Sequence, residues 1–214
     1  MSRLIGAGAA LLGLVLATQL PRPATRVPRL PFYQTAERTP EWIAAGTPAY
    51  AKIHRVADFS LTDQDGTTVT AASVAGKVYV ASFFYTACRQ LCPKLETNLA
   101  QVQAAFRDDS NVLILSHTVT PESDDTAALR RYAKANGIIA GKWHLLTGPV
   151  DEIARLARDS YFAQLPDSVN GAPTALLHSE TFVLVDGERR VRGVYDGSLP
   201  YDVERLIADI HALR

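Results

Sequence analysis

Residues 78–93 read VYVASFFYTACRQLCP. The run that opens this stretch, residues 78–85, is apolar and rich in aromatic and branched side chains, which is typical of a strand buried on both faces of a sheet. Beyond it, apolar side chains recur every three or four positions, a pattern that predicts an amphipathic helix. The members of this pattern are Cys88, Cys92, Leu95, Leu99, Val102 and Phe106. The stretch therefore predicts a buried strand that leads directly into a helix.

The rest of the chain alternates between strand and helix patterns. Such alternation predicts an α/β domain built around a central sheet. Short apolar runs predict strands at residues 112–116, 143–146, 181–185 and 191–195, and helical periodicity predicts helices at residues 124–136, 149–161 and 203–213. Asp124 and Asp125 are interpreted as capping acids of the helix that they open.

Two further segments have recognisable local patterns. Residues 59–61 and 67–69 flank the turn-rich sequence DQDG at residues 63–66, which predicts a hairpin at the start of the domain. Residues 162–175 are polar and irregular, and such a length without regular structure indicates a functional insertion.

Composition bounds the class of protein. The chain of 214 residues has room for one domain of ordinary size and a tail. Its composition, 47% hydrophobic and 21% charged, is normal for a globular protein. The 22 basic residues balance the 22 acidic residues, and no basic run exceeds an arginine pair. This balance argues against a nucleic-acid partner, which would require a positive surface.

The N-terminal residues differ from everything that follows. After Arg3, residues 4–17 hold no charged side chain, so residues 1–20 are predicted to be a signal peptide or an N-terminal membrane anchor. A buried helix is the alternative for this run. Residues 21–53 are interpreted as a tether and irregular lead-in, because they open with a segment rich in proline and arginine. The folded domain is then expected at residues 54–214.

The chain holds two cysteines, and both lie where the buried strand gives way to the helix. In α/β sheets this C-terminal edge is where ligands and reactive groups collect. Two cysteines four residues apart can bind one metal ion together or close into a disulfide. A helix N-terminus and the adjacent Arg89 both favour the thiolate form. Since Pro93 is tolerated only in a first turn, the helix is expected to start near Leu91 or Cys92.

Two other interpretations of the cysteine pair stay open. Both side chains could extend the apolar stripe of the helix, or they could form a purely structural disulfide. The position at a strand-to-helix junction, and the lack of any other cysteine in the sequence, favour a chemical role. The three residues between the cysteines differ from the two of an ordinary thioredoxin dithiol.

Several segments, taken in order, resemble the Sco/SenC family of copper-handling proteins. Any one of them alone would be weak, but together they span about residues 54–214. The matching segments are Asp58-Phe59 with Asp65-Gly66, Phe84-Tyr85-Thr86-Ala87-Cys88 through Cys92-Pro93, Val119-Thr120-Pro121-Glu122 with Leu129 and Tyr132-Ala133, Trp143 with Leu146-Thr147-Gly148, and His178 before Phe182-Val183-Leu184-Val185-Asp186 with Gly193 and Tyr195.

The resemblance implies a single-domain, thioredoxin-like fold whose mixed sheet is flanked by helices and preceded by a hairpin. It implies one copper ion bound by two cysteines and a distant histidine, which map to Cys88, Cys92 and His178. It further implies that the protein delivers copper to, or matures, the binuclear copper site of cytochrome c oxidase. The copper-receiving subunit of a terminal oxidase is then the expected partner, with other copper carriers or thiol reductants beside it.

The resemblance also implies a location outside the cytoplasm, on the periplasmic side, for a protein that is membrane-anchored or exported. The arginines that follow the apolar run, Arg22, Arg26 and Arg29, favour the opposite orientation by the positive-inside rule. The family resemblance outweighs them in this interpretation.

The donor set agrees with the implied metal. Two thiolates and one imidazole form a soft, three-coordinate set that suits Cu(I) and also accommodates Cu(II). His117 is a rival for the histidine position, because it ends a predicted strand at the same expected edge of the sheet. Arg89 stands where many family members have proline, and Thr120 stands where many have aspartate.

The alternative function is that of an extracytoplasmic thiol–disulfide oxidoreductase, in which Cys88 and Cys92 reduce the cysteines of a partner protein. Both functions require the two cysteines, but only copper binding should require His178. The two roles are compatible, since copper binding needs the reduced pair.

Overall fold

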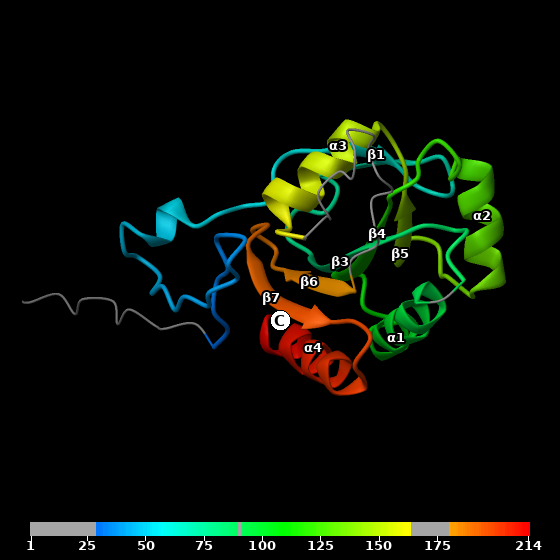
Figure 1. The fold of residues 1–214 in the computed structure, drawn as a ribbon. Coiled ribbons are helices and arrows are strands. Elements are labelled where there is room, and N and C mark those ends of the chain that lie inside the picture. Colours follow the sequence, from blue (N-terminus) through cyan, green and yellow to red (C-terminus); the bar gives the residue numbers. More distant parts are fainter. Residues whose placement is uncertain (1–28, 90, 164–179) are drawn as a thin grey trace, which may run out of the picture.

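The computed structural model describes residues 29–89, 91–163 and 180–214 (Figure 1). At the centre of this part of the chain lies a five-stranded mixed sheet with the strand order β5-β4-β3-β6-β7. The strands β3, β4 and β5 are parallel, whereas β6 is antiparallel to both of its neighbours. The strands are β3 Val78–Phe84, β4 Val112–Thr118, β5 Trp143–Leu146, β6 Thr181–Val185 and β7 Val191–Asp196. The expected α/β architecture with a central mixed sheet is confirmed.

Helices cover both faces of this sheet. One face shares an apolar cluster with α1, α2 and α4, and the other face shares a second cluster with α3 and the N-terminal hairpin. The helices α1 and α2 lie on the same face because successive right-handed crossovers add strands in one direction. The helices are α1 Cys92–Ala105, α2 Thr126–Ala135, α3 Val150–Arg155 continued by the π-helical turn η2 Leu156–Ser160, α4 Pro200–Ala212 and the short 3₁₀ turn η1 Tyr50–Lys52.

The central strand β3 is buried along its whole length, as its apolar sequence predicts. Its side chains alternate between the two clusters with the period of two that a strand imposes. Tyr79 and Phe83 pack with the hairpin and α3, whereas Val80 and Phe84 pack with α1, α2 and α4. This alternation fixes which later side chains can approach the cysteines, because α1 covers only one of the two faces.

The predicted hairpin is confirmed. It forms from β1 (Ser60–Thr62) and β2 (Thr68–Thr70), which pair antiparallel. Asp63 closes the turn, since its Oδ1 accepts hydrogen bonds from two backbone N–H groups within the turn, at 2.9 Å each. Gly66 adopts a φ of 82°, a left-handed conformation that glycine tolerates without strain.

The lead-in before the hairpin contacts the outer edge of the sheet. The Tyr33 N–H donates to the Val191 carbonyl at 3.0 Å, and Arg192 Nε donates to a backbone carbonyl of the lead-in at 2.9 Å. Phe32 is buried beneath the Arg192 guanidinium, whose central carbon lies 4.1 Å from the ring centroid, a cation–π contact. The lead-in therefore lies beside β7, where Figure 1 draws it in blue and cyan.

The predicted export segment is not part of this description. Residues 1–20 lie outside the described residues, as does most of the predicted insertion at residues 162–175. Among the helices of residues 29–89, 91–163 and 180–214, none combines the length and the apolar character needed to cross a membrane.

Candidate metal centre

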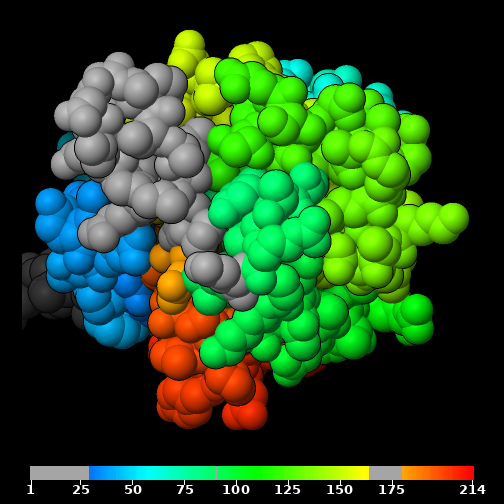
Figure 2. Space-filling view, turned by 45° about the vertical axis from the view of Figure 1, so that its right-hand side comes forward, coloured from blue at the N-terminus to red at the C-terminus, as the bar shows by residue number. Residues whose placement is uncertain are grey.

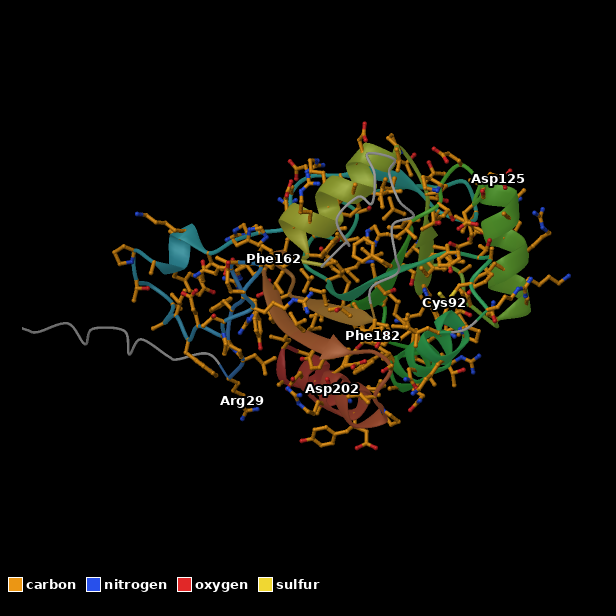
Figure 3. All side chains as sticks on the ribbon, in the orientation of Figure 1. Arg29, Cys92, Asp125, Phe162, Phe182 and Asp202 are labelled. Carbon is orange, nitrogen blue, oxygen red and sulfur yellow. The ribbon has the colours of Figure 1, made fainter. Side chains whose placement is uncertain are left out.

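The two cysteines lie at the C-terminal edge of the sheet, between β3 and α1. The helix begins at Cys92, with Leu91 as its N-cap residue and Pro93 in its first turn. Proline fits there because the first N–H groups of a helix have no intrahelical partner. Cys88 lies in the loop just before the helix, as the position of Pro93 predicts. Figure 3 shows Cys92 at the start of α1, close to the sheet.

The sulfur of Cys88 takes the place of a helix cap. Its Sγ accepts a hydrogen bond from the Cys92 backbone N–H, with 3.3 Å between the nitrogen and the sulfur. Neither cysteine is in a disulfide, and their exposed fractions are 6% for Cys88 and 1% for Cys92. A helix N-terminus favours negative charge, so a metal-bound thiolate at this sulfur would be stabilised electrostatically.

Cys92 is the more deeply placed thiol. Together with Trp143 and Phe182 it lines a small apolar pocket of about 10 Å³, which has room for at most one water molecule. Burial, with a further contribution from the neighbouring Cys88 thiol, raises the pKa of Cys92 to about 12. The expectation that the helix N-terminus and Arg89 favour the thiolate is therefore wrong for Cys92, because desolvation outweighs them. A thiophilic metal would have to displace this proton on binding.

Asp124 ties the cysteine loop to the neighbouring strand. This carboxylate is buried, and its Oδ2 accepts hydrogen bonds from the Thr86 N–H at 3.1 Å and the Thr118 hydroxyl at 2.5 Å. Its Oδ1 accepts from the Thr86 hydroxyl at 2.5 Å, and the Thr120 hydroxyl adds a bond to Oδ2 at 3.1 Å. Since Thr86 lies two positions before Cys88, this network holds the loop that carries the first thiol.

The interpretation of Asp124 as a helix cap is thus wrong, whereas that of Asp125 is confirmed. Asp125 is the N-cap of α2, and its Oδ1 accepts a hydrogen bond from the Ala128 N–H at 2.7 Å (Figure 3). One cap needs one carboxylate, so the residue before it is free to turn inward. The threonines around Asp124 were the sequence signal for this role, because hydroxyl groups are natural donors to a buried carboxylate.

The histidine expected as the third ligand, His178, lies outside the described residues. Its rival, His117, lies on β4 opposite Phe83 in the pairing of β3 with β4. The His117 ring stacks on Phe83 at a centroid distance of 5.1 Å and lies 5.4 Å from the ring of Tyr161. It therefore faces α3, on the opposite side of the sheet from Cys92, and His117 is wrong as the rival ligand.

The described part of the site supplies two sulfur donors. Within residues 29–89, 91–163 and 180–214, no three histidine, cysteine, aspartate or glutamate side chains are grouped closely enough to hold a metal ion. Two buried thiols at a helix N-terminus fit a soft cation such as Cu(I), which prefers sulfur ligands and tolerates low coordination numbers.

Glu96 is a residue of this site that the sequence interpretation missed. It follows Cys92 by one helical turn, lines the same apolar pocket, and has a buried Oε1 with no hydrogen-bond partner among the described residues. Burial raises the pKa of Glu96 to about 7. The spacing of four residues from Cys92 on one helix face was the signal that could have identified it.

We expect Glu96→Gln to stabilise the reduced protein by about 1–2 kcal/mol at pH 8. The pKa of Glu96 in the fold, about 7, lies above its ordinary value of 4.5, so its contribution to stability is present at low pH and is lost as pH rises through 7. The full shift is discounted because the side chain keeps part of its contact with water. Urea unfolding should show the gain at pH 8 and not at pH 5, and an equal gain at both would contradict this account.

Known proteins resemble this chain over the part that contains the sheet and both cysteines. The SCO1/SenC family model matches residues 48–214. The chain is 29% identical over 163 residues to the SCO1 protein homolog of Bacillus subtilis (strain 168), a match that covers 73% of this chain and 81% of that protein.

Two solved structures extend the comparison. One is that of BsSco, a member of the Sco family of cytochrome c oxidase assembly proteins in which a disulfide switch has been identified. It matches with a TM-score of 0.64 and 26% identity over 75% of this chain and 94% of that one. The crystal structure of Arabidopsis thaliana ScoI with copper bound matches with a TM-score of 0.58 and 25% identity, covering 74% and 97%. Because the family model matches most of the chain, including the strand-to-helix stretch with both cysteines, the chain belongs to the SCO1/SenC family.

Proposed function

We propose that this chain is a copper metallochaperone that acts in cytochrome c oxidase assembly. The observation that carries the proposal is the pair of buried, reduced cysteines at the N-terminus of α1, in a chain of the SCO1/SenC family. Two related proteins support it: the Arabidopsis thaliana relative has copper bound, and BsSco belongs to a family of cytochrome c oxidase assembly proteins.

In this proposal one copper ion is the cargo, and Cys88, Cys92 and His178 are its ligands. Cys88 is placed to offer a sulfur whose negative charge the helix N-terminus stabilises. Cys92 gives up its proton when the metal binds, so loading should release protons and weaken as pH falls. Asp124 keeps the Cys88 loop in place through its hydrogen bonds to Thr86.

The route by which the cargo leaves follows from the low coordination number. A three-ligand copper site has room for an incoming sulfur or nitrogen donor, so the ion can pass to the receiving protein by ligand exchange. We propose the copper-receiving subunit of a terminal oxidase as that protein, and other copper carriers or thiol reductants as sources of metal or electrons. We further propose that residues 1–20 export the chain or anchor it to the membrane, so that the domain works on the periplasmic side.

A second candidate function is thiol–disulfide exchange with a partner protein. The observation that favours it is the direct contact of the two thiol residues, since the Cys88 sulfur accepts the Cys92 backbone N–H. The disulfide switch reported for BsSco points in the same direction. Copper loading and redox exchange would then compete for one reduced pair.

Copper binding by the reduced chain and two variants tests the proposal. We expect the parent to bind one copper ion per chain, and we expect Cys88→Ser and His178→Ala each to lower its affinity by at least about a hundredfold, because each removes one of three ligands. Competition with a chromogenic Cu(I) chelator measures both stoichiometry and affinity. His211→Ala, on the exposed side of α4, is the matched histidine control and should bind copper like the parent.

The outcomes separate the two functions. Unchanged affinity in His178→Ala would show that the third ligand lies elsewhere. A parent that binds no copper would leave thiol–disulfide exchange as the function of Cys88 and Cys92. Conversely, loss of copper binding in His178→Ala with intact disulfide exchange would show that both activities share the cysteines and only copper binding uses the histidine.

A further inference from the structure

A groove opens beside Cys88, between α1 and α2. Its volume is about 650 Å³. Cys88, Arg89 and Glu96 line one side of it, and Arg131 and Tyr132 of α2 line the other. Figure 2 shows the segments of α1 and α2 adjoining on one face of the molecule.

Two arginines and one acidic residue, Glu96, line this groove, so basic groups outnumber acidic ones. Arg89 and Arg131 are both exposed, and neither forms an ion pair with any described carboxylate, including that of Glu96. The helix α2 carries two further cations, Arg130 and Lys134, and no acidic residue. A guanidinium group presents a planar set of N–H donors that matches a carboxylate, so two arginines without an ion pair among the described residues, on either side of a thiol, make the groove complementary to an anionic ligand.

The groove gives access to one thiol of the pair. Cys88 lines it, whereas Cys92 lines the small apolar pocket on the inner side of α1. A partner that enters the groove would therefore meet the Cys88 sulfur first.

We propose that this groove docks an acidic peptide segment of the partner protein, whose carboxylates contact Arg89 and Arg131 while a partner cysteine meets Cys88. The inference deepens the proposed function and rests on its thiol chemistry. Guanidinium groups bind carboxylates in a bidentate manner, which fixes orientation as well as adding affinity. Opposite charge around the reacting sulfur also raises the rate of encounter.

The disulfide exchange needs no further oxidant or reductant, because the electrons that the partner gains come from Cys88 and Cys92. The Cys88 thiolate attacks one sulfur of a partner disulfide, a bond forms between the two sulfurs, and the second partner sulfur leaves as a thiolate. Cys92 then loses its proton to solvent and attacks the Cys88 sulfur. The Cys88–Cys92 disulfide forms, and the partner is released as a dithiol that has gained two electrons.

Three synthetic peptides test the inference with the reduced full-length chain. Each contains one intramolecular disulfide, flanked by aspartate and glutamate, by asparagine and glutamine, or by lysine and arginine. Stopped-flow measurement of Cys88–Cys92 disulfide formation gives the second-order rate for each peptide. We expect the acidic peptide to react about tenfold faster than the neutral one at low salt, and the basic peptide to react most slowly.

Substitutions of single arginines then show which residues cause the preference for the acidic peptide. The readout is the ratio of the acidic to the neutral rate, which cancels any change in the intrinsic reactivity of the thiol. Arg131→Gln should lower this ratio about threefold, and the double variant Arg89→Gln/Arg131→Gln should bring it close to one. Arg130→Gln is the matched control: it removes an equal charge from the adjacent position of α2, outside the lining of the groove, and should change the ratio by less than a factor of two.

Three results would overturn the inference. These are equal rates for the three peptides, an equal loss of preference in Arg130→Gln and Arg131→Gln, and no reaction with any peptide. Copper binding measured on the same preparation distinguishes a failure of the docking groove from a failure of the proposed function. If the chain binds copper but reacts with the three peptides at equal rates, only the docking inference fails, and the proposed copper function stands.

Discussion

Replacing Asp124 by asparagine is expected to lower the free energy of unfolding of the reduced protein by about 3 kcal/mol. The buried Asp124 carboxylate accepts three hydrogen bonds from threonine hydroxyls and one from a backbone N–H. A hydrogen bond to a charged group contributes about 1.5–3 kcal/mol, and the bonds of one network are not additive. An asparagine amide would present its NH₂ group to some of these donors and leave them unpaired, away from water.

The adjacent Asp125→Asn is the matched control for this substitution. Asparagine caps a helix about as well as aspartate, so the exposed cap of α2 should lose only about a few tenths of a kcal/mol. Urea denaturation of the two variants and the parent measures the difference. If Asp124→Asn were as mild as Asp125→Asn, the hydrogen-bond network around Thr86 would carry little weight in holding the fold.

The same network predicts a local effect at the metal centre. Thr86 donates two of the four hydrogen bonds that Asp124 accepts, and it lies two positions before Cys88. Folded Asp124→Asn should therefore bind copper more weakly than folded Asp125→Asn, because the loop that positions the first thiol has lost its anchor. Equal copper affinity in the two variants would confine the role of Asp124 to stability.

Much of the fold was accessible from local sequence patterns. The apolar run that opens at Val78 is rich in aromatic and branched side chains and predicted a strand covered on both faces, and β3 is buried throughout. Pro93 limited the start of the following helix to one or two positions, and α1 begins at Cys92. These predictions held because each depends on interactions within a few residues: side-chain periodicity, and the missing N–H of proline.

The wrong predictions concern residues whose surroundings are formed by distant parts of the chain. The sequence places His117 at the end of a strand, at the same edge as the cysteines, but the face on which it lies depends on its register opposite Phe83. A shift of one residue would have moved it to the side of α1. The pKa of Cys92 likewise depends on burial by residues far along the chain, such as Trp143 and Phe182, which no local pattern places beside it.

The stability of the protein is expected to fall by about 2 kcal/mol between pH 7 and pH 5 through His117 alone. Burial lowers the pKa of His117 to about 4, although its hydrogen bond to the Ser82 carbonyl acts in the opposite direction. Its Nε2 is buried and has no hydrogen-bond partner among the described residues. An unfolded histidine keeps an ordinary pKa of about 6.5. The unfolded state therefore takes up the proton first, so the contribution is fully present above pH 6.5 and is lost as pH falls toward 4.

The variant His117→Phe isolates this contribution, because it removes the titrating group and keeps an aromatic ring against Phe83 and Tyr161. Urea unfolding at a series of pH values should show a stability that varies with pH by about 2 kcal/mol less than in the parent. Leu115→Ala changes the same face of β4 without a titrating group, so it should lower stability about equally at every pH. Parallel pH profiles for the parent and His117→Phe would mean that the fold accommodates a charged imidazole at this position. The acid sensitivity would then have to arise from the carboxylates, of which Asp124 is buried at the metal centre.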